Sequence, residues 1–231
     1  MSTARQLLQT ATSAVAPEIT FTFGMGDMKK LLVIFHNSEK IVFALIPVVN
    51  LGVFLFSPLL LYVWLHKPGL YDSSVYALMA VISGAISVRE HKQFFQFSTN
   101  THEKLSYIVF FGNLAMILTS IPAIYEFGMQ GFLWIWLFSE VFQMLLIYNE
   151  NRVLFDRDPS ISIVPALKLV GIFALCVPLC VALIHFTQGR SFETLSLIGI
   201  AGIALLTVQS YYVFGVKDVY ALFQKRIQKI A

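Results

Sequence analysis

Long runs of apolar residues with almost no charge dominate this sequence. Runs of roughly 18 or more such residues, at about 1.5 Å of rise per helical residue, are long enough to cross a hydrocarbon core of about 30 Å. The runs are continuous rather than alternating, so they indicate membrane helices and not the strands of a barrel. Six spans are predicted, over about residues 41–65, 73–95, 105–125, 131–150, 163–186 and 195–215.

The composition supports the same class of protein. Hydrophobic residues make up 57% of the 231 residues and charged residues 13%, and the mean hydropathy is +0.74. A water-soluble domain is rarely so apolar. We therefore expect an all-α, polytopic membrane helical bundle, with a six-helix transmembrane domain at 41–215 and a basic cytoplasmic tail at 216–231.

Residues 1–40 precede the first predicted span and have a different pattern. The first part lacks a continuous apolar core, so it predicts a partial helix that ends near Pro17 rather than a signal peptide. The sequence "FGMGD" then breaks the chain with two glycines. We expect Asp27 to cap a cytoplasmic amphipathic helix that leads directly into the first span.

Lysine and arginine alternate between rich and poor connections along the chain. The positive-inside rule places the rich connections, and with them both termini, in the cytoplasm. The connection between the third and fourth spans, "EFGMQG" at 126–131, has no basic residue and is predicted to be a short external turn whose glycines permit the reversal. The rich connections contain Arg5, Lys29, Lys30, Lys40, Arg89, Lys92, Lys104, Arg152, Arg157 and the basic residues of the tail.

Two segments resemble a known family of transporters. One is "AVAPEITFTFGMGDMKKLLVIFHNSEKIVFALIPVVNLGVFLFSPLLLYVWL", and the other is "YEFGMQGFLWIWLFSE", with Gly128 and Gly131. They are similar to polysaccharide and O-antigen flippases of the multidrug/oligosaccharidyl-lipid/polysaccharide exporter superfamily, and the resemblance covers residues 11 to about 215. The matching positions in the first segment are Pro17, Glu18, Gly26, Asp27, Lys29, Lys30 and Pro47.

The resemblance implies a specific function and partners. Members of this family have two lobes that move around a central cavity, and this chain is similar to the second lobe alone. It implies translocation of a polyprenyl-pyrophosphate-linked oligosaccharide across the bacterial cytoplasmic membrane. Because alternating access requires two halves around a shared site, we expect the chain to be incomplete as a transporter alone and to need a first lobe or another membrane protein.

Charged residues inside the predicted spans are the strongest candidates for a substrate cavity, because an ionisable group in a membrane helix costs about 2.5 to 3.5 kcal/mol on insertion scales. Glu140 lies near the middle of the fourth span, where it could bind a proton or cation, pair with a base or hold a neighbouring helix. Lys168 could attract a pyrophosphate, pair with Glu140 or extend to the cytoplasmic surface. Arg89 and Lys92 could line the inner mouth of a cavity, although a basic helix end at the lipid surface is the commoner arrangement.

Asn50 and Asn113 complete the predicted cavity residues. Interhelical hydrogen bonds of about 0.6 kcal/mol each would also explain both amides without a ligand.

Other functional classes have less support in the sequence. It contains no phosphate-binding loop, metal-ligand motif or nucleophile elbow, so we expect neither an enzyme nor a cofactor or metal site. The net charge of +3 is mainly a topology signal, which gives no reason to expect a nucleic-acid partner. The alternative to a flippase component is a free-standing membrane scaffold or partner protein in envelope polysaccharide synthesis.

Overall fold

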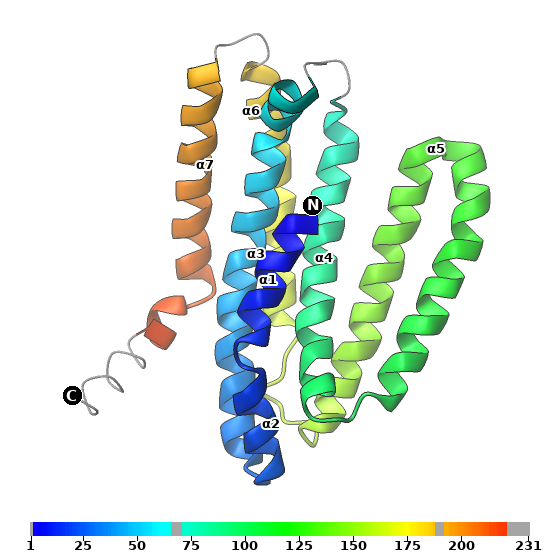
Figure 1. Cartoon of the computed structure of the whole chain (residues 1–231), viewed down its shortest axis with the longest axis vertical. Coiled ribbons are helices and arrows are strands. Elements are labelled where there is room, and N and C mark those ends of the chain that lie inside the picture. The colour runs from blue at the N-terminus through cyan, green and yellow to red at the C-terminus, as the bar shows by residue number, and fades with distance from the viewer. Residues whose placement is uncertain (1, 66–70, 188–191, 221–231) are drawn as a thin grey trace.

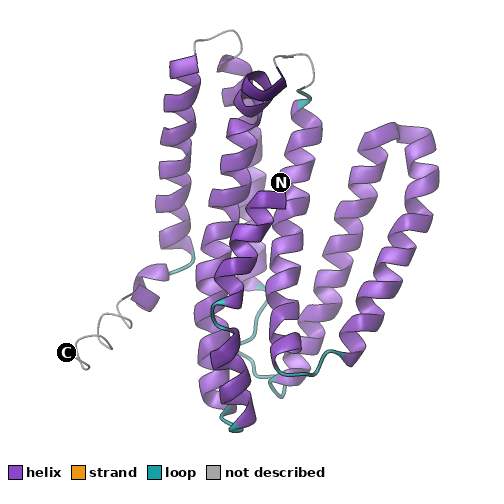
Figure 2. Ribbon diagram, in the orientation of Figure 1, coloured by secondary structure: helices purple, strands orange, loops and turns teal. Residues whose placement is uncertain are grey.

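The structure is a computed structural model that describes residues 2–65, 71–187 and 192–220, so residues 221–231 of the predicted basic tail lie outside it. Within these ranges every regular element is a helix, and short loops join the helices (Figure 2). The all-α expectation is confirmed for this part of the chain. The helices are α1 (Ser2–Ser13), α2 (Ala16–Gly24), α3 (Met28–Leu65), α4 (Ser73–Ser98), α5 (Glu103–Leu154), α6 (Val164–Thr187) and α7 (Phe192–Val213).

Four of the described helices are long and apolar enough to cross a membrane. These segments are Met28–Leu61, Glu103–Leu154, Val164–Phe186 and Ser196–Val213. Helix α4, which contains the charged residues Arg89, Glu90 and Lys92, is not among them. The second, fifth and sixth predicted ranges match α4, α6 and α7 to within three residues at each end. The first begins inside α3, which starts 13 residues earlier, and the third and fourth are the two arms of α5. The count of six membrane crossings stays a prediction.

Helix α5 consists of two arms that fold back on each other (Figure 1). The reversal is at Gly128, where φ is 61° and ψ is −145°. Residues other than glycine rarely adopt this backbone conformation. A Cβ atom on Gly131 would lie 2.3 Å from the carbonyl oxygen of Ala123, so this glycine lets the two arms approach closely. The predicted reversal at "EFGMQG" and the role of its glycines are therefore confirmed, and the external location of the turn stays a prediction.

The amino-terminal segment differs in one respect from its prediction. Helix α1 ends at Ser13 and not near Pro17, which instead lies in the first turn of α2. A proline there loses no helical hydrogen bond, because the first N–H groups of a helix have no partner within it. As expected, Asp27 caps the next helix by accepting a hydrogen bond of 3.0 Å from the Lys30 N–H. The predicted amphipathic helix is the beginning of α3.

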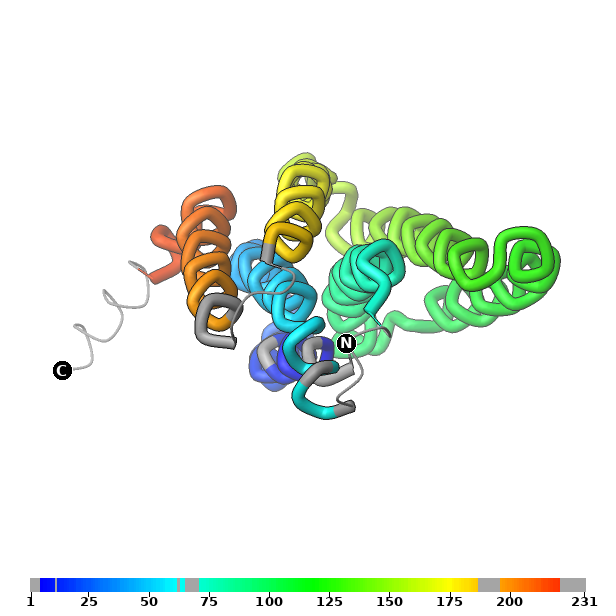
Figure 3. Tube along the Cα trace, turned by 90° about the horizontal axis from the view of Figure 1, so that it is seen from above, coloured from blue at the N-terminus to red at the C-terminus, as the bar shows by residue number. Residues whose placement is uncertain are grey.

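Helices α3 and α4 are the centre of the packing. Helix α3 contacts α1, α2, α4, α6 and α7, and α4 contacts α1, α2, α3, α5 and α6. In the view from above, α7 and the α5 hairpin lie on opposite sides of these two helices (Figure 3). The fold therefore surrounds α4 on several sides, and polar side chains on α4 must find partners on neighbouring helices.

Candidate functional site

One turn of α4 carries charges that reach three different helices. We call residues 89–92 the charged turn. Arg89 pairs with Glu140 of α5, Glu90 pairs with Arg5 of α1, and Lys92 pairs with Glu39 of α3. Successive residues of an α-helix are turned by about 100°, so neighbouring charges on the charged turn point in different directions. These directions explain how one turn of α4 pairs with three neighbouring helices.

Glu140 and Arg89 form the buried ion pair of the site. The Nε atom of Arg89 lies 2.6 Å from one carboxylate oxygen of Glu140, and the two side chains are 12% and 3% exposed. The indole N–H of Trp136, one turn earlier on the same helix, donates a 3.1 Å hydrogen bond to the other oxygen. One carboxylate oxygen therefore accepts a hydrogen bond, while the other makes a close ion contact with Arg89 that does not have hydrogen-bond geometry.

Amide side chains extend this pair into a network across both arms of α5. The guanidinium of Arg89 lies 3.4 Å from the side-chain oxygen of Gln143 and donates to it. The amide N–H₂ of Gln143 in turn donates to Asn113 at 3.3 Å and to Ser139 at 3.1 Å. Gly112 makes space for Gln143, because a Cβ atom at residue 112 would lie 2.7 Å from its side chain. Arg89, Glu140 and Asn113 were predicted cavity residues, and the structure brings them together.

The sequence did not lead us to predict a second buried ion pair, which Lys92 forms with Glu39. The ammonium group of Lys92 donates to the Glu39 carboxylate and lies 4.4 Å from the centre of the Phe35 ring. The Lys92 side chain is only 4% exposed, so the expectation of a basic helix end at the lipid surface is wrong for this residue. Glu39 lies two residues before the first predicted span, which is why it was not counted among the charges inside the spans.

Two histidines accompany the second pair. The Nδ1 atom of His36 lies 4.0 Å from the Glu39 carboxylate, and its Nε2 atom hydrogen-bonds the hydroxyl of Ser160 at 3.0 Å. His91 is fully enclosed and hydrogen-bonds Ser38 at 3.1 Å. The spacing of His36 and Glu39, three residues apart on an amphipathic helix, is the sequence signal that could have indicated a shared face.

Lys168 and Asn50, the other predicted cavity residues, lie outside the network. Lys168 is exposed, and its ammonium group donates a 3.3 Å hydrogen bond to the carbonyl oxygen of Val213 on α7. The alternative in which Lys168 pairs with Glu140 is therefore wrong, because Glu140 is paired with Arg89. Asn50 is buried in α3 and donates to the Ile46 carbonyl of its own helix at 2.9 Å, whereas its side-chain oxygen has no hydrogen-bond partner in the described part of the chain.

In the part of the chain that the structure describes, no three His, Cys, Asp or Glu side chains gather in a way that could hold a metal ion. What the site offers chemically is a pair of buried opposite charges beside amide groups that can both donate and accept hydrogen bonds. In comparisons with known protein families, with proteins of curated function and with solved structures, the chain matches none of them.

Proposed function

We propose that the protein takes part in moving lipid-linked oligosaccharide precursors across the bacterial cytoplasmic membrane, with both termini in the cytoplasm. The observation that supports this proposal best is the buried network of Arg89, Glu140, Gln143 and Asn113 between α4 and α5. Ionisable residues within membrane helices are costly and usually belong to substrate or ion pathways. A sugar headgroup, which carries many hydroxyl groups, is suited to such a mixture of charges and amides.

The proposal includes a partner. Transport by alternating access needs two units that move around a shared site near the middle of the membrane. We propose that this chain supplies one unit, and that a first lobe or another membrane protein supplies the other. The sequence contains no phosphate-binding loop for ATP, so an ion gradient, the membrane potential or consumption of the product would drive the transport.

Surface polysaccharide production tests this function. A strain of the source bacterium without the gene would be complemented with the wild-type chain or with Glu140→Gln, which keeps the shape of the side chain and removes its charge. We expect polysaccharide output, normalised to the amount of folded protein because the substitution also lowers stability, to fall at least roughly tenfold, the effect of about 1.4 kcal/mol in the barrier. Lys168→Gln is the matched control, because Lys168 lies outside the network. Unchanged output in the Glu140 variant at normal protein levels would contradict the proposal.

The proposed orientation has its own test. Lys29 lies in the first turn of α3 and Gln130 lies in the α5 turn, and both side chains are exposed. In a variant without Cys176 and Cys180, single cysteines would replace Lys29 or Gln130 and be treated with a membrane-impermeant maleimide on intact spheroplasts. We expect labelling of Gln130→Cys in intact cells and of Lys29→Cys only after permeabilisation. The reverse pattern would contradict the proposed orientation.

A further inference from the structure

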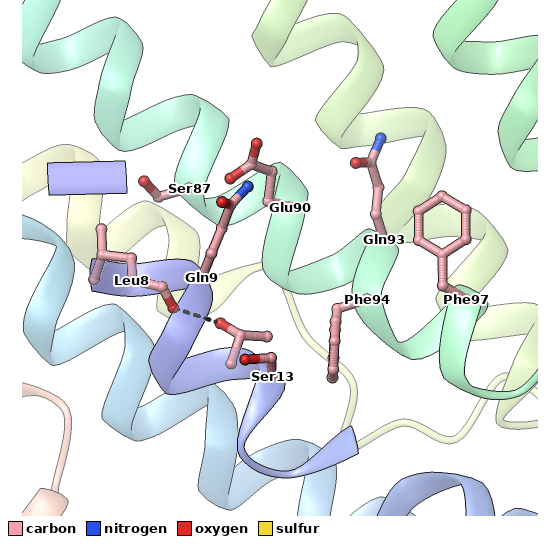
Figure 4. Close-up of a pocket in the computed structure, with 9 residues that line it drawn as sticks. Leu8, Gln9, Ser13, Ser87, Glu90, Gln93, Phe94 and Phe97 are labelled. Carbon is pink, nitrogen blue, oxygen red and sulfur yellow. Dashed lines mark hydrogen bonds between the residues drawn. The ribbon is translucent and has the colours of Figure 1, made fainter. Parts of the chain in front are cut away.

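A pocket between α1 and α4 lies outside the network described above. Its volume is about 290 Å³, near the lower limit of the roughly 300–1,000 Å³ that small-molecule sites occupy. Figure 4 shows its lining, in which residues of α1 face a stripe of residues along α4. Six of the nine residues that line the pocket carry a polar group, although apolar atoms provide most of its surface. Its polar lining residues are Gln9, Thr12, Ser13, Ser87, Glu90 and Gln93.

Gln93 is the residue that most strongly indicates a ligand. It is only 8% exposed, and in the described part of the chain its side chain has no hydrogen-bond partner, although it lines the pocket. The amide group of Gln93 stays open to the pocket rather than sealed from it, so it can both donate to and accept from a ligand that enters.

The other polar residues that line the pocket can also accept hydrogen bonds from a ligand. The hydroxyls of Thr12, Ser13 and Ser87 donate to carbonyl oxygens of their own helices at 3.0, 3.0 and 2.7 Å, so their oxygen atoms remain able to accept. The amide of Gln9 lies beside the Glu90 carboxylate (Figure 4). The pocket therefore has several acceptors for the hydroxyl groups of a ligand.

Charge and aromatic rings narrow the class of ligand. Glu90 is the one charged residue among those that line the pocket, and its carboxylate pairs with Arg5 at 3.1 Å, so no unpaired positive charge is available for a phosphate. Phe94 and Phe97 lie further along α4 and provide ring surfaces (Figure 4). A pyranose sugar has a rim of hydroxyl groups and a face of C–H groups, which match these two kinds of surface.

We propose that this pocket between α1 and α4 is a binding subsite for an uncharged pyranose unit, with Gln93 and Glu90 hydrogen-bonding its hydroxyl groups and Phe94 or Phe97 covering its C–H face. The proposal rests on the proposed function, because it identifies which part of an oligosaccharide the chain would hold. It places this part on α1 and α4, on a different face of α4 from Arg89.

Ligand-observed saturation-transfer NMR tests the subsite directly. The full chain in lipid nanodiscs would be mixed with glucose, galactose, mannose or N-acetylglucosamine, with glycerol as the polyol that has no ring. We expect saturation transfer to at least one pyranose and none above background to glycerol. Absence of transfer to all four sugars would overturn the proposal.

Variants identify where the sugar binds. Gln93→Leu removes the unpartnered amide at similar volume, and we expect binding to weaken roughly three- to tenfold, as for the loss of one hydrogen-bonding group. Ser13→Trp fills the pocket from an exposed position of α1 and should abolish binding. Gln209→Leu on α7 is the matched control and should bind as the wild type does. Equal binding in all four proteins would overturn the assignment to this pocket.

The same measurements separate the two proposals. Sugar binding that depends on Gln93, together with polysaccharide output that is unaffected by Glu140→Gln, would overturn the proposed function and support the subsite. Output that depends on Glu140, without any sugar binding, would overturn the subsite alone.

Discussion

The Nε atom of Arg89 lies 2.6 Å from the carboxylate of Glu140, and this pair joins α4 to the second arm of α5 in a place where both side chains are almost fully enclosed. A buried pair of this kind is expensive to break from one side only, because the remaining charge has no partner. Replacing both charges together costs less free energy of unfolding, because no unpaired charge remains buried. This asymmetry gives a first prediction.

Glu140→Gln should lower the stability of the protein by about 3 kcal/mol, since it leaves the Arg89 charge buried and unpaired. The double variant Arg89→Met with Glu140→Leu should lose less than the single variant. Thermal unfolding in detergent can be followed with a thiol-reactive dye, because Cys176 and Cys180 are free and buried in the folded protein. A double variant that is less stable than the single one would contradict this account.

The second prediction compares a buried with an exposed ion pair. Glu39→Gln breaks the pair with Lys92, whose side chain is 4% exposed, whereas Glu18→Gln breaks the pair with Lys30, whose side chain is 39% exposed. We expect a loss of about 3 kcal/mol for the first variant and at most about 1 kcal/mol for the second. The same dye assay measures both. Similar unfolding temperatures for the two variants would show that burying the Lys92 charge does not require its pairing with Glu39.

The third prediction concerns the space around Gln143. In Gly112→Ala the new Cβ atom would lie 2.7 Å from the Gln143 side chain, so the amide must move away from Asn113. We expect a destabilisation of about 1–3 kcal/mol from this overpacking. Gly171→Ala in α6 is the control, because its new Cβ atom would have no neighbouring atom within 4 Å and alanine favours a helix. Equal effects of the two substitutions would contradict the predicted contact.

The fourth prediction concerns pH and the loop that joins α5 to α6. Hydrogen bonds from the side chain and the backbone N–H of Ser160 hold the pKa of Asp158 below its ordinary value of 3.8. A lowered pKa in the folded state means that this turn contributes to stability above pH 3.8 and loses the contribution as the pH falls through the folded-state pKa.

Ser160→Ala should therefore raise the pKa of Asp158 toward 3.8, which a carboxyl-carbon NMR titration of the selectively labelled protein can measure. Ser162→Ala, in the same loop, is the control and should leave the titration of Asp158 unchanged. An Asp158 pKa that is the same in Ser160→Ala and in the wild type would show that these hydrogen bonds do not hold the carboxylate.

The features that the sequence predicted well depend on local chemistry. Gly128 marks the reversal of α5 because a positive φ favours glycine, and Asp27 caps α3 because a short acceptor side chain suits that position. The all-helical character follows from the long apolar runs. Arg89, Glu140 and Asn113 could also be identified from the sequence as candidate site residues, since polar groups within apolar helices need partners.

The pairing of these residues could not be predicted from order along the chain. Lys168 was an equally reasonable partner for Glu140, because it follows on the next predicted span. The choice depends on which face each helix presents, and α6 packs chiefly against α3 whereas α5 packs chiefly against α4. Glu39 and Lys92 were missed as a pair for the same reason, since only the antiparallel alignment of α3 and α4 brings them to one level.

The charged turn of α4 has a consequence for how the bundle can move. Its three ion pairs connect α4 to α1, α3 and α5 from three directions. A rotation of α4 about its own axis would separate all three pairs. The two buried pairs would then leave charges without partners, so they fix the rotational setting of α4 relative to α3 and α5 more strongly than the exposed pair with Arg5 fixes it relative to α1.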